Sequence, residues 1–179
     1  MTILLNQHPA TGGPGIEPRW TRSDKDGIGT AYSALSRVWF TISRGIINEV
    51  YYPTIDRPQI RDLQYLVTDG ESFFHDSRRQ MESTHEYLAP HALGFRVTSS
   101  DPEGRYRIIK EVITDPHQAC VLMHTRLEAD STVLSRLRLF ALLAPHLEGG
   151  GWGNNGNVVR TAQGLVLTAH KGRTWLALG

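Results

Sequence analysis

Apolar and polar residues alternate along most of the chain in short segments that end at turn-forming residues. A period of two is typical of strands that place one face against a core. Segments of helical length with an apolar stripe of period 3.6 are missing. The predicted strands cover residues 38–42, 46–52, 63–68, 94–98, 106–114, 119–127, 135–144, 157–161, 165–169 and 174–178.

The connections between these segments carry residues that favour tight turns. They read "TDGES", "SDPEGR", "TAQGL" and "HKGR", each with a glycine. The best helical candidate, "RRQMESTHEYLAP", has Ser83 and Glu86 at capping-box spacing, and Pro90 limits it to one turn. Many short strands at close spacing predict an all-β fold, an antiparallel β-sandwich.

The two ends of the chain differ from its middle. Residues 1–29 are rich in Gly, Pro and Thr without periodicity, and they are expected to form an extended arm ahead of a β-sandwich domain over residues 30–179. The last segment, "GRTWLALG", stops in an apolar strand, so the chain is expected to be part of a larger protein and its sandwich to be incomplete.

Composition narrows the classes of partner. Nineteen basic and eighteen acidic residues give a net charge of +1, which provides no electrostatic reason to expect nucleic acid or a membrane as partner. No apolar run approaches the roughly 20 residues of a membrane span. The start lacks the pattern of a secretory signal, so a cytoplasmic location is expected. The single cysteine, Cys120, excludes an internal disulfide.

Four carboxylates lie in or after the segment "VWFTISRGIINEVYYPTIDRPQIRDL": Glu49, Asp56, Asp62 and Asp69. Glycoside hydrolysis needs two carboxyl groups on opposite sides of a sugar, and one sequence does not show which of these face each other. Arg61 precedes Asp62 and would lower its pKa, which is wrong for a general acid and favours a structural pair.

Metal and nucleophile patterns are weak. His75, His85 and His91 match no compact zinc spacing, and Cys120 lies among apolar strand residues, where a thiol is usually inert. No metal and no cofactor is expected.

The aromatic residues allow two interpretations. Trp39, Tyr51, Tyr52 and Trp152 could stack on sugars, whereas aromatic residues in strands more often belong to a core. Neighbouring residues of a strand point to opposite faces, so one of the two tyrosines is expected inside the sandwich and the other outside.

Six segments, in order, resemble one family. The segments "PGIEPRW", "SRVWFTISRGIINEVYYPTID", "RDLQYLVTDG", "YRIIKEVITDP", "LRLFALLAPHL" and "GWGNNG" are similar to the N-terminal domain of bacterial and archaeal glucoamylases and glucodextranases, in glycoside hydrolase family fifteen. The resemblance implies a large antiparallel supersandwich, like that of galactose mutarotase, followed by a separate catalytic (α/α)₆ barrel. In that family both catalytic glutamates, the acid and base of an inverting hydrolysis of terminal α-glucosidic bonds, lie in the barrel.

Three functions follow as hypotheses. The first is a domain that is inactive alone and supports the barrel of an exo-α-glucosidase acting on α-glucan oligosaccharides. The second is an autonomous carbohydrate-binding module for α-glucans, and the third is an active glycosidase built on Glu49 and Asp62. The candidate substrate-binding or interdomain residues are Trp39, Tyr51, Tyr52, Arg61, Asp62 and Trp152. Open sheet edges further predict a dimer.

Overall fold

The computed structural model describes residues 7–10, 17, 20 and 24–179. In this part of the chain, fourteen strands form three antiparallel sheets, joined by one short α-helix, α1 (Ser131–Leu134), and one 3-10 turn, η1 (Leu147–Gly149). The predicted all-β, antiparallel sandwich is confirmed. None of the described helices is long and apolar enough to cross a membrane.

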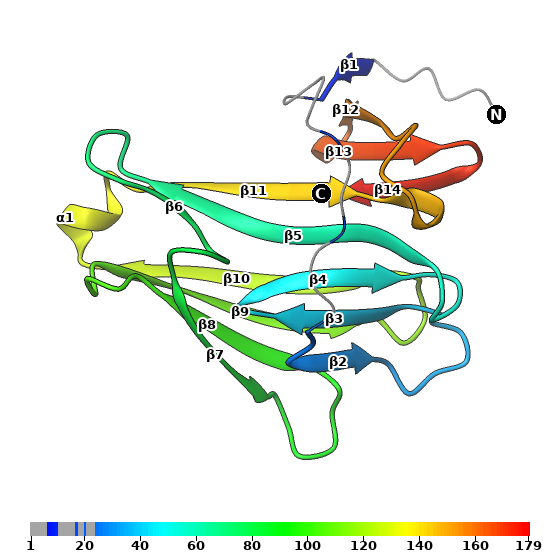
Figure 1. Ribbon diagram of the computed structural model, residues 1–179, viewed down its shortest axis with the longest axis horizontal. Coiled ribbons are helices and arrows are strands. Elements are labelled where there is room, and N and C mark those ends of the chain that lie inside the picture. The colour runs from blue at the N-terminus through cyan, green and yellow to red at the C-terminus, as the bar shows by residue number, and fades with distance from the viewer. Residues whose placement is uncertain (1–6, 11–16, 18–19, 21–23) are drawn as a thin grey trace.

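The first sheet has the order β11-β5-β4-β3-β2, with β6 paired to the far end of β5 (Figure 1). Its hairpin between β3 and β4 turns at Arg44 and Gly45, whose φ angles of 48° and 78° match the type I′ turn that suits twisted strands. The strands are β2 (Gly27–Thr30), β3 (Trp39–Ser43), β4 (Ile46–Tyr51), β5 (Pro58–Thr68), β6 (Phe74–Asp76) and β11 (Arg138–Pro145).

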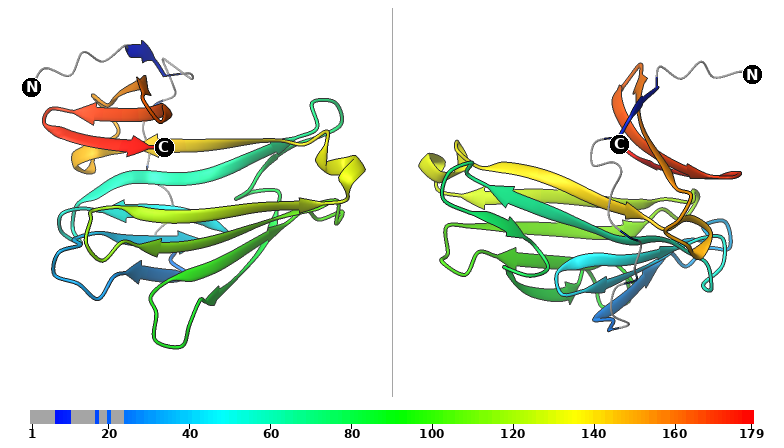
Figure 2. Two further views of the ribbon diagram at one scale, coloured as in Figure 1. Left: turned by 180° about the vertical axis from the view of Figure 1, so that it is seen from behind. Right: turned by 45° about the horizontal axis from the view of Figure 1, so that its top comes forward.

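The second sheet lies behind the first and has the order β10-β9-β8-β7. The third, with the order β1-β12-β13-β14, stands over the β11 side of the first sheet (Figure 2). The strands are β7 (Glu82–Tyr87), β8 (Phe95–Ser100), β9 (Tyr106–Thr114), β10 (Val121–Ala129), β1 (Gln7–Pro9), β12 (Asn155–Thr161), β13 (Gly164–Lys171) and β14 (Thr174–Leu178).

The core fills the space between the first two sheets. Phe40 and Ile42 of β3 meet Phe95 and Val112 of the second sheet, and the Phe40 and Phe95 rings pack edge to face with centroids 6.2 Å apart. A second cluster around Val67, Met81, Tyr106 and Ile108 extends the same layer toward α1. Leu176 of β14 packs against the first cluster, which attaches the third sheet to the sandwich.

The strands agree with the alternating pattern, apart from four elements. β1, β2, β6 and β7 are strands that the sequence did not predict. The helical turn expected at Ser83 and Glu86 is wrong, because both residues lie in β7, paired with Ser99 and Arg96 of β8. Their spacing matches a capping box by chance.

The N-terminal segment is partly strand. β2 spans the boundary drawn between the arm and the domain at residues 29 and 30, and it pairs with β3. β1 pairs with β12. The "GPG" stretch lies outside the described residues, and Trp20 packs its ring edge-on against His146, with centroids 4.5 Å apart.

Open strand edges occur in the described part of all three sheets. β14 pairs only with β13, β10 only with β9, and β11 only with β5. A dimer that forms through such an edge stays a prediction.

One inward position of the core carries a charge-bearing side chain. Lys110 of β9 is 4% exposed, and its Nζ donates to the Gly45 carbonyl oxygen and to Ser99 Oγ. Burial disfavours the ammonium form and lowers the pKa of Lys110 to about 8.

The contribution of Lys110 to the stability of the chain should therefore rise with pH above neutrality. In the unfolded chain the lysine pKa is near 10.4, so between these two values the unfolded state binds more protons. From pH 7 to 9.5 we expect the free energy of unfolding to gain about 2 kcal/mol relative to a Lys110→Met variant. Urea titrations of both proteins at the two pH values measure it. A wild-type-minus-variant difference that does not change with pH would contradict the prediction.

Candidate functional site

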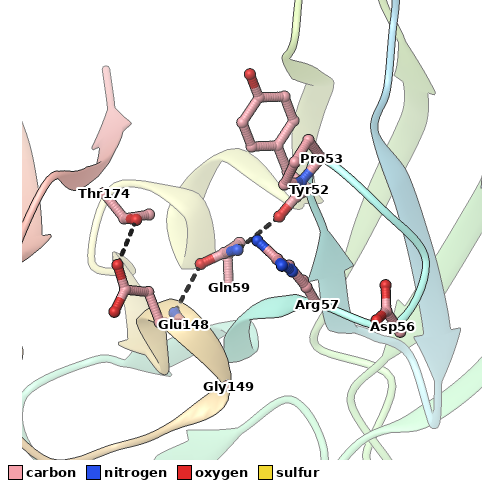
Figure 3. Close-up of a pocket in the computed structure, with 8 residues that line it drawn as sticks. All are labelled: Tyr52, Pro53, Asp56, Arg57, Gln59, Glu148, Gly149 and Thr174. Atoms are coloured by element: carbon pink, nitrogen blue, oxygen red, sulfur yellow. Dashed lines mark hydrogen bonds between the residues drawn. The ribbon is translucent and has the colours of Figure 1, made fainter.

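A pocket of about 340 Å³ opens where β4 passes into β5, beside η1 and the start of β14 (Figure 3). It brings together segments far apart in the sequence. It is lined by Tyr52, Pro53, Asp56, Arg57, Gln59, Glu148, Gly149 and Thr174.

Gln59 connects the two segments that form the walls of this pocket. Its side chain is almost fully buried, its Nε2 donates to the Tyr52 carbonyl oxygen at 2.6 Å, and its Oε1 accepts the backbone N–H of Glu148 at 2.9 Å. The Gln59 carbonyl oxygen also accepts the backbone N–H of His146 at 3.0 Å. One residue thus holds the β4–β5 loop and η1 together, which Figure 3 shows at its centre.

Glu148 adopts a backbone conformation that is unusual for its type. Its φ of 56° and ψ of 36° lie in the left-handed region, where a non-glycine residue is uncommon and costly. The bond that the Glu148 N–H donates to Gln59 Oε1 and a bond from Thr174 Oγ1 to Glu148 Oε1 at 2.8 Å hold it there. In the described part of the chain, no hydrogen bond or ion pair engages Glu148 Oε2.

Two more charged residues line the pocket. A hydrogen bond from the Thr54 hydroxyl is the main cause that lowers the pKa of Asp56. The Arg57 guanidinium makes no hydrogen bond or ion pair within the described residues, although it lies near enough to Asp56 to lower that pKa further. The pocket therefore contains an acceptor, Glu148 Oε2, and donors, the Arg57 N–H groups, that form no hydrogen bonds with the described residues.

Trp39 and Tyr51 lie elsewhere, side by side on β3 and β4. Their strand neighbours Phe40 and Val50 face the core, so this pair is on the outer face of the first sheet. The Tyr51 hydroxyl donates to Glu49, which also forms an ion pair with Lys25. Burial, followed by the bond to Glu49, raises the pKa of Tyr51.

The prediction that one of Tyr51 and Tyr52 lies in the core of the sandwich and the other on its surface is wrong. Tyr51 is half-buried on the outer face, and Tyr52 is 37% exposed. Alternation ends because β4 stops at Tyr51, and a register shift lies between Val50 and Tyr51 in the pairing with β5.

Arg61 and Asp62 form the structural pair that the sequence favoured. Asp62 is fully buried, and its Oδ2 accepts a bond from Arg61 Nε at 2.8 Å, whereas its Oδ1 has no partner among the described residues. His146 is buried nearby, and burial, followed by the charge of Arg61, lowers its pKa. Trp20 covers His146.

Trp152 is 70% exposed at the tip of a loop between η1 and β12. Asn154 shapes this loop, since its side chain accepts the N–H of Leu147 at 3.0 Å and donates to the Gly150 carbonyl oxygen at 2.8 Å. Trp152 does not line the pocket. The six predicted residues thus fall into four places: the Trp39–Tyr51 pair, Tyr52 in the pocket, the Arg61–Asp62 pair, and Trp152.

Asp69, His75 and His85 make contacts within the fold. Asp69 accepts the backbone N–H groups of Glu71 and Ser72 in the β5–β6 turn, at 3.0 and 2.8 Å. His75 Nδ1 is 2.8 Å from the Tyr106 hydroxyl, and His85 packs edge-on against Phe95. Cys120 is a free thiol of intermediate exposure. The described residues hold no cluster of three or more His, Cys, Asp or Glu side chains that could bind a metal.

Sequence reasoning missed Gln59, Glu148 and Thr174. Gln59 and Glu148 are 89 positions apart, and neither lies in a motif. The one local signal was the glycine-rich "LEGGGWGNNG", which indicates unusual backbone conformations but not the side chain that would use them.

Comparisons with known proteins agree with this fold. The sequence profile of the family "Glucodextranase, domain N" matches residues 10–179. A glucoamylase from Clostridium sp. (strain G0005) is 36% identical over 174 residues, which are 97% of this chain and 25% of that protein. The crystal structure of a bacterial glucoamylase complexed with acarbose superposes with a TM-score of 0.89 at 35% identity, over 94% of this chain and 25% of that one. The chain therefore spans about a quarter of the length of these relatives.

Proposed function

This chain belongs to the glucodextranase domain N family, and from that premise we propose that it supports the catalytic (α/α)₆ barrel of a glucoamylase-type exo-α-glucosidase and is inactive alone. The observation that carries the proposal is the length of its relatives, three quarters of which lies beyond the matched region. For the parent enzyme we propose inverting hydrolysis of terminal α-linked glucose in glucan oligosaccharides.

Three of the four carboxylates singled out from the sequence support the inactivity of the chain, because the fold engages them. Glu49 is engaged by Lys25 and Tyr51, and Asp62 is buried against Arg61. Asp69 is engaged by the backbone of its own turn. A general acid and base need access to the glycosidic bond on both sides, and these three groups are already used by the fold. Glu49 and Asp62 therefore do not form a free acid–base pair.

The isolated chain is expected to release no glucose from maltooligosaccharides or nitrophenyl α-glucoside. A coupled glucose assay against a protein-free blank measures this directly. Release above the blank that Glu49→Gln or Asp62→Asn abolishes would overturn the proposed role and support a glycosidase in this chain.

The docking surface that we propose is the exposed part of residues 48–63. Ile55, at the tip of the β4–β5 loop, is 61% exposed although it is a large apolar residue. An apolar anchor surrounded by polar residues is common at the centre of interdomain contacts. The occupant that we propose is the catalytic barrel, because three quarters of the glucoamylase relative lies beyond the matched region and leaves room for such a domain.

Ile55→Glu separates docking from folding. In the isolated chain, this change should alter the free energy of unfolding by no more than about 0.5 kcal/mol, because the side chain is already in water. In the parent enzyme it should weaken the contact between the two domains, which limited proteolysis and thermal inactivation detect. Leu35→Glu, at a similarly exposed leucine (70%) on the β2–β3 loop, is the control. Equal effects of the two changes on the parent enzyme would refute Ile55 as an anchor.

A further inference from the structure

We infer that the pocket between the β4–β5 loop and η1 binds a neutral sugar ring, as a non-catalytic saccharide site on this domain. Its volume of about 340 Å³ falls within the range of roughly 300–1,000 Å³ typical of small-molecule sites. Tyr52, Pro53, Asp56 and Arg57 of the lining also belong to the segment proposed to dock on the barrel. The saccharide site is therefore tested on the isolated chain, separately from the proposed docking.

The lining has the mixture of groups that a pyranose requires. Tyr52 and Pro53 provide an apolar side against which the C–H face of a sugar can pack. Glu148 and Asp56 provide carboxylate acceptors for hydroxyl groups, and Arg57 provides a planar set of donors. Two carboxylates against one guanidinium disfavour an anion such as phosphate.

The pocket is also held in place before any ligand arrives. The Gln59 amide is bonded at both ends, to the Tyr52 carbonyl oxygen and to the N–H of Glu148. Glu148 is kept in the left-handed region even though glycine would fit there at lower cost. Backbone strain of this kind gathers at functional sites. Glu148 Oε2 and the Arg57 guanidinium, without partners among the described residues, are the groups left for a ligand.

The test is titration of the 179-residue chain with methyl α-D-glucopyranoside and maltotriose, followed by calorimetry and by chemical-shift changes. A single small ring in an open pocket should bind with a dissociation constant on the order of 1 mM. Tyr52→Ala and Arg57→Met should each weaken binding about tenfold, and Trp152→Ala, outside the pocket, should leave it unchanged.

Glu148→Gly distinguishes a ligand group from a structural one. Glycine relieves the left-handed backbone, so the variant should melt at the same or a higher temperature. If Glu148 binds the sugar, the same variant should bind about tenfold more weakly. Lack of saturable binding by the wild-type chain up to tens of millimolar would overturn the inference. Binding that survives the Tyr52, Arg57 and Glu148 changes but is lost in Trp152→Ala would overturn it as well.

Discussion

Replacing Arg61 by methionine is expected to lower the free energy of unfolding by about 3–5 kcal/mol, because it leaves Asp62 as a buried charge without its cation. Asp62 is fully buried, and the bond from Arg61 Nε at 2.8 Å is the one hydrogen bond to its carboxylate within the described residues. Methionine keeps most of the length and apolar stem of arginine, so the change removes mainly the charge and the donors. Urea unfolding of the isolated chain measures the effect.

Two comparisons isolate the cause. Arg136→Met breaks an ion pair with Glu71 in which both side chains are more than half exposed, and this should cost no more than about 1 kcal/mol. The double change Arg61→Met with Asp62→Leu removes both charges and should recover most of the lost stability, since a buried pair can be replaced by apolar residues at little cost. If Arg61→Met destabilised no more than Arg136→Met, the pair would not be a buried structural contact.

The parts of the fold that the sequence predicted are those with one face on the core. β9 alternates along its whole length, with Tyr106, Ile108 and Val112 inside, and its predicted limits are those of the structure. β14 was predicted with equal accuracy. A strand with one face on the core carries apolar residues at every second position. The alternating sequence pattern therefore predicts such a strand.

The strands that the sequence did not predict lack an alternation of buried apolar and exposed polar residues. β7 is exposed at every position, so its sequence shows no alternation of apolar and polar residues. Its sequence "ESTHEY" is therefore equally compatible with the start of a helix. The first part of β5 was missed for the opposite reason. Gln59 and Asp62 are polar yet buried, because they serve hydrogen bonds and an ion pair rather than a core. Contacts with distant parts of the chain make both β7 and the first part of β5 form strands, and these contacts leave no pattern in the local sequence.

The candidate site shows the same division. Sequence pattern identified Tyr52 and the Arg61–Asp62 pair because both lie within one short segment. It did not find Glu148, which lines the pocket beside Tyr52 and is bonded there to Gln59 from a distant part of the sequence. Resemblance to a family covers nearly the whole chain, but it gives these residues no role, since it implies that the catalytic glutamates lie in another domain.

The other large effect is expected in the core, where Phe40→Ala should destabilise the chain by about 3–5 kcal/mol. Phe40 is fully buried between the first two sheets, and its ring packs edge-on against Phe95. Removing it loses the transfer free energy of the ring and leaves a cavity that two paired sheets cannot close. Phe74→Ala, at a phenylalanine that is 60% exposed, is the matched control and should change stability by about 0.5 kcal/mol or less.

The residue opposite Phe40 gives this prediction a second test. Gly29 of β2 pairs with Phe40, and a Cβ at Gly29 would lie 2.1 Å from Phe40 Cζ. Glycine is therefore required there to admit the ring, and Gly29→Ala alone should be destabilising. In the Phe40→Ala background the clash with the ring is gone, and the contact with the Leu93 carbonyl oxygen at 2.7 Å remains. The two single effects should therefore sum to more than the double variant shows. Strict additivity in a double-mutant cycle, measured by urea unfolding, would show that the ring does not lie over Gly29.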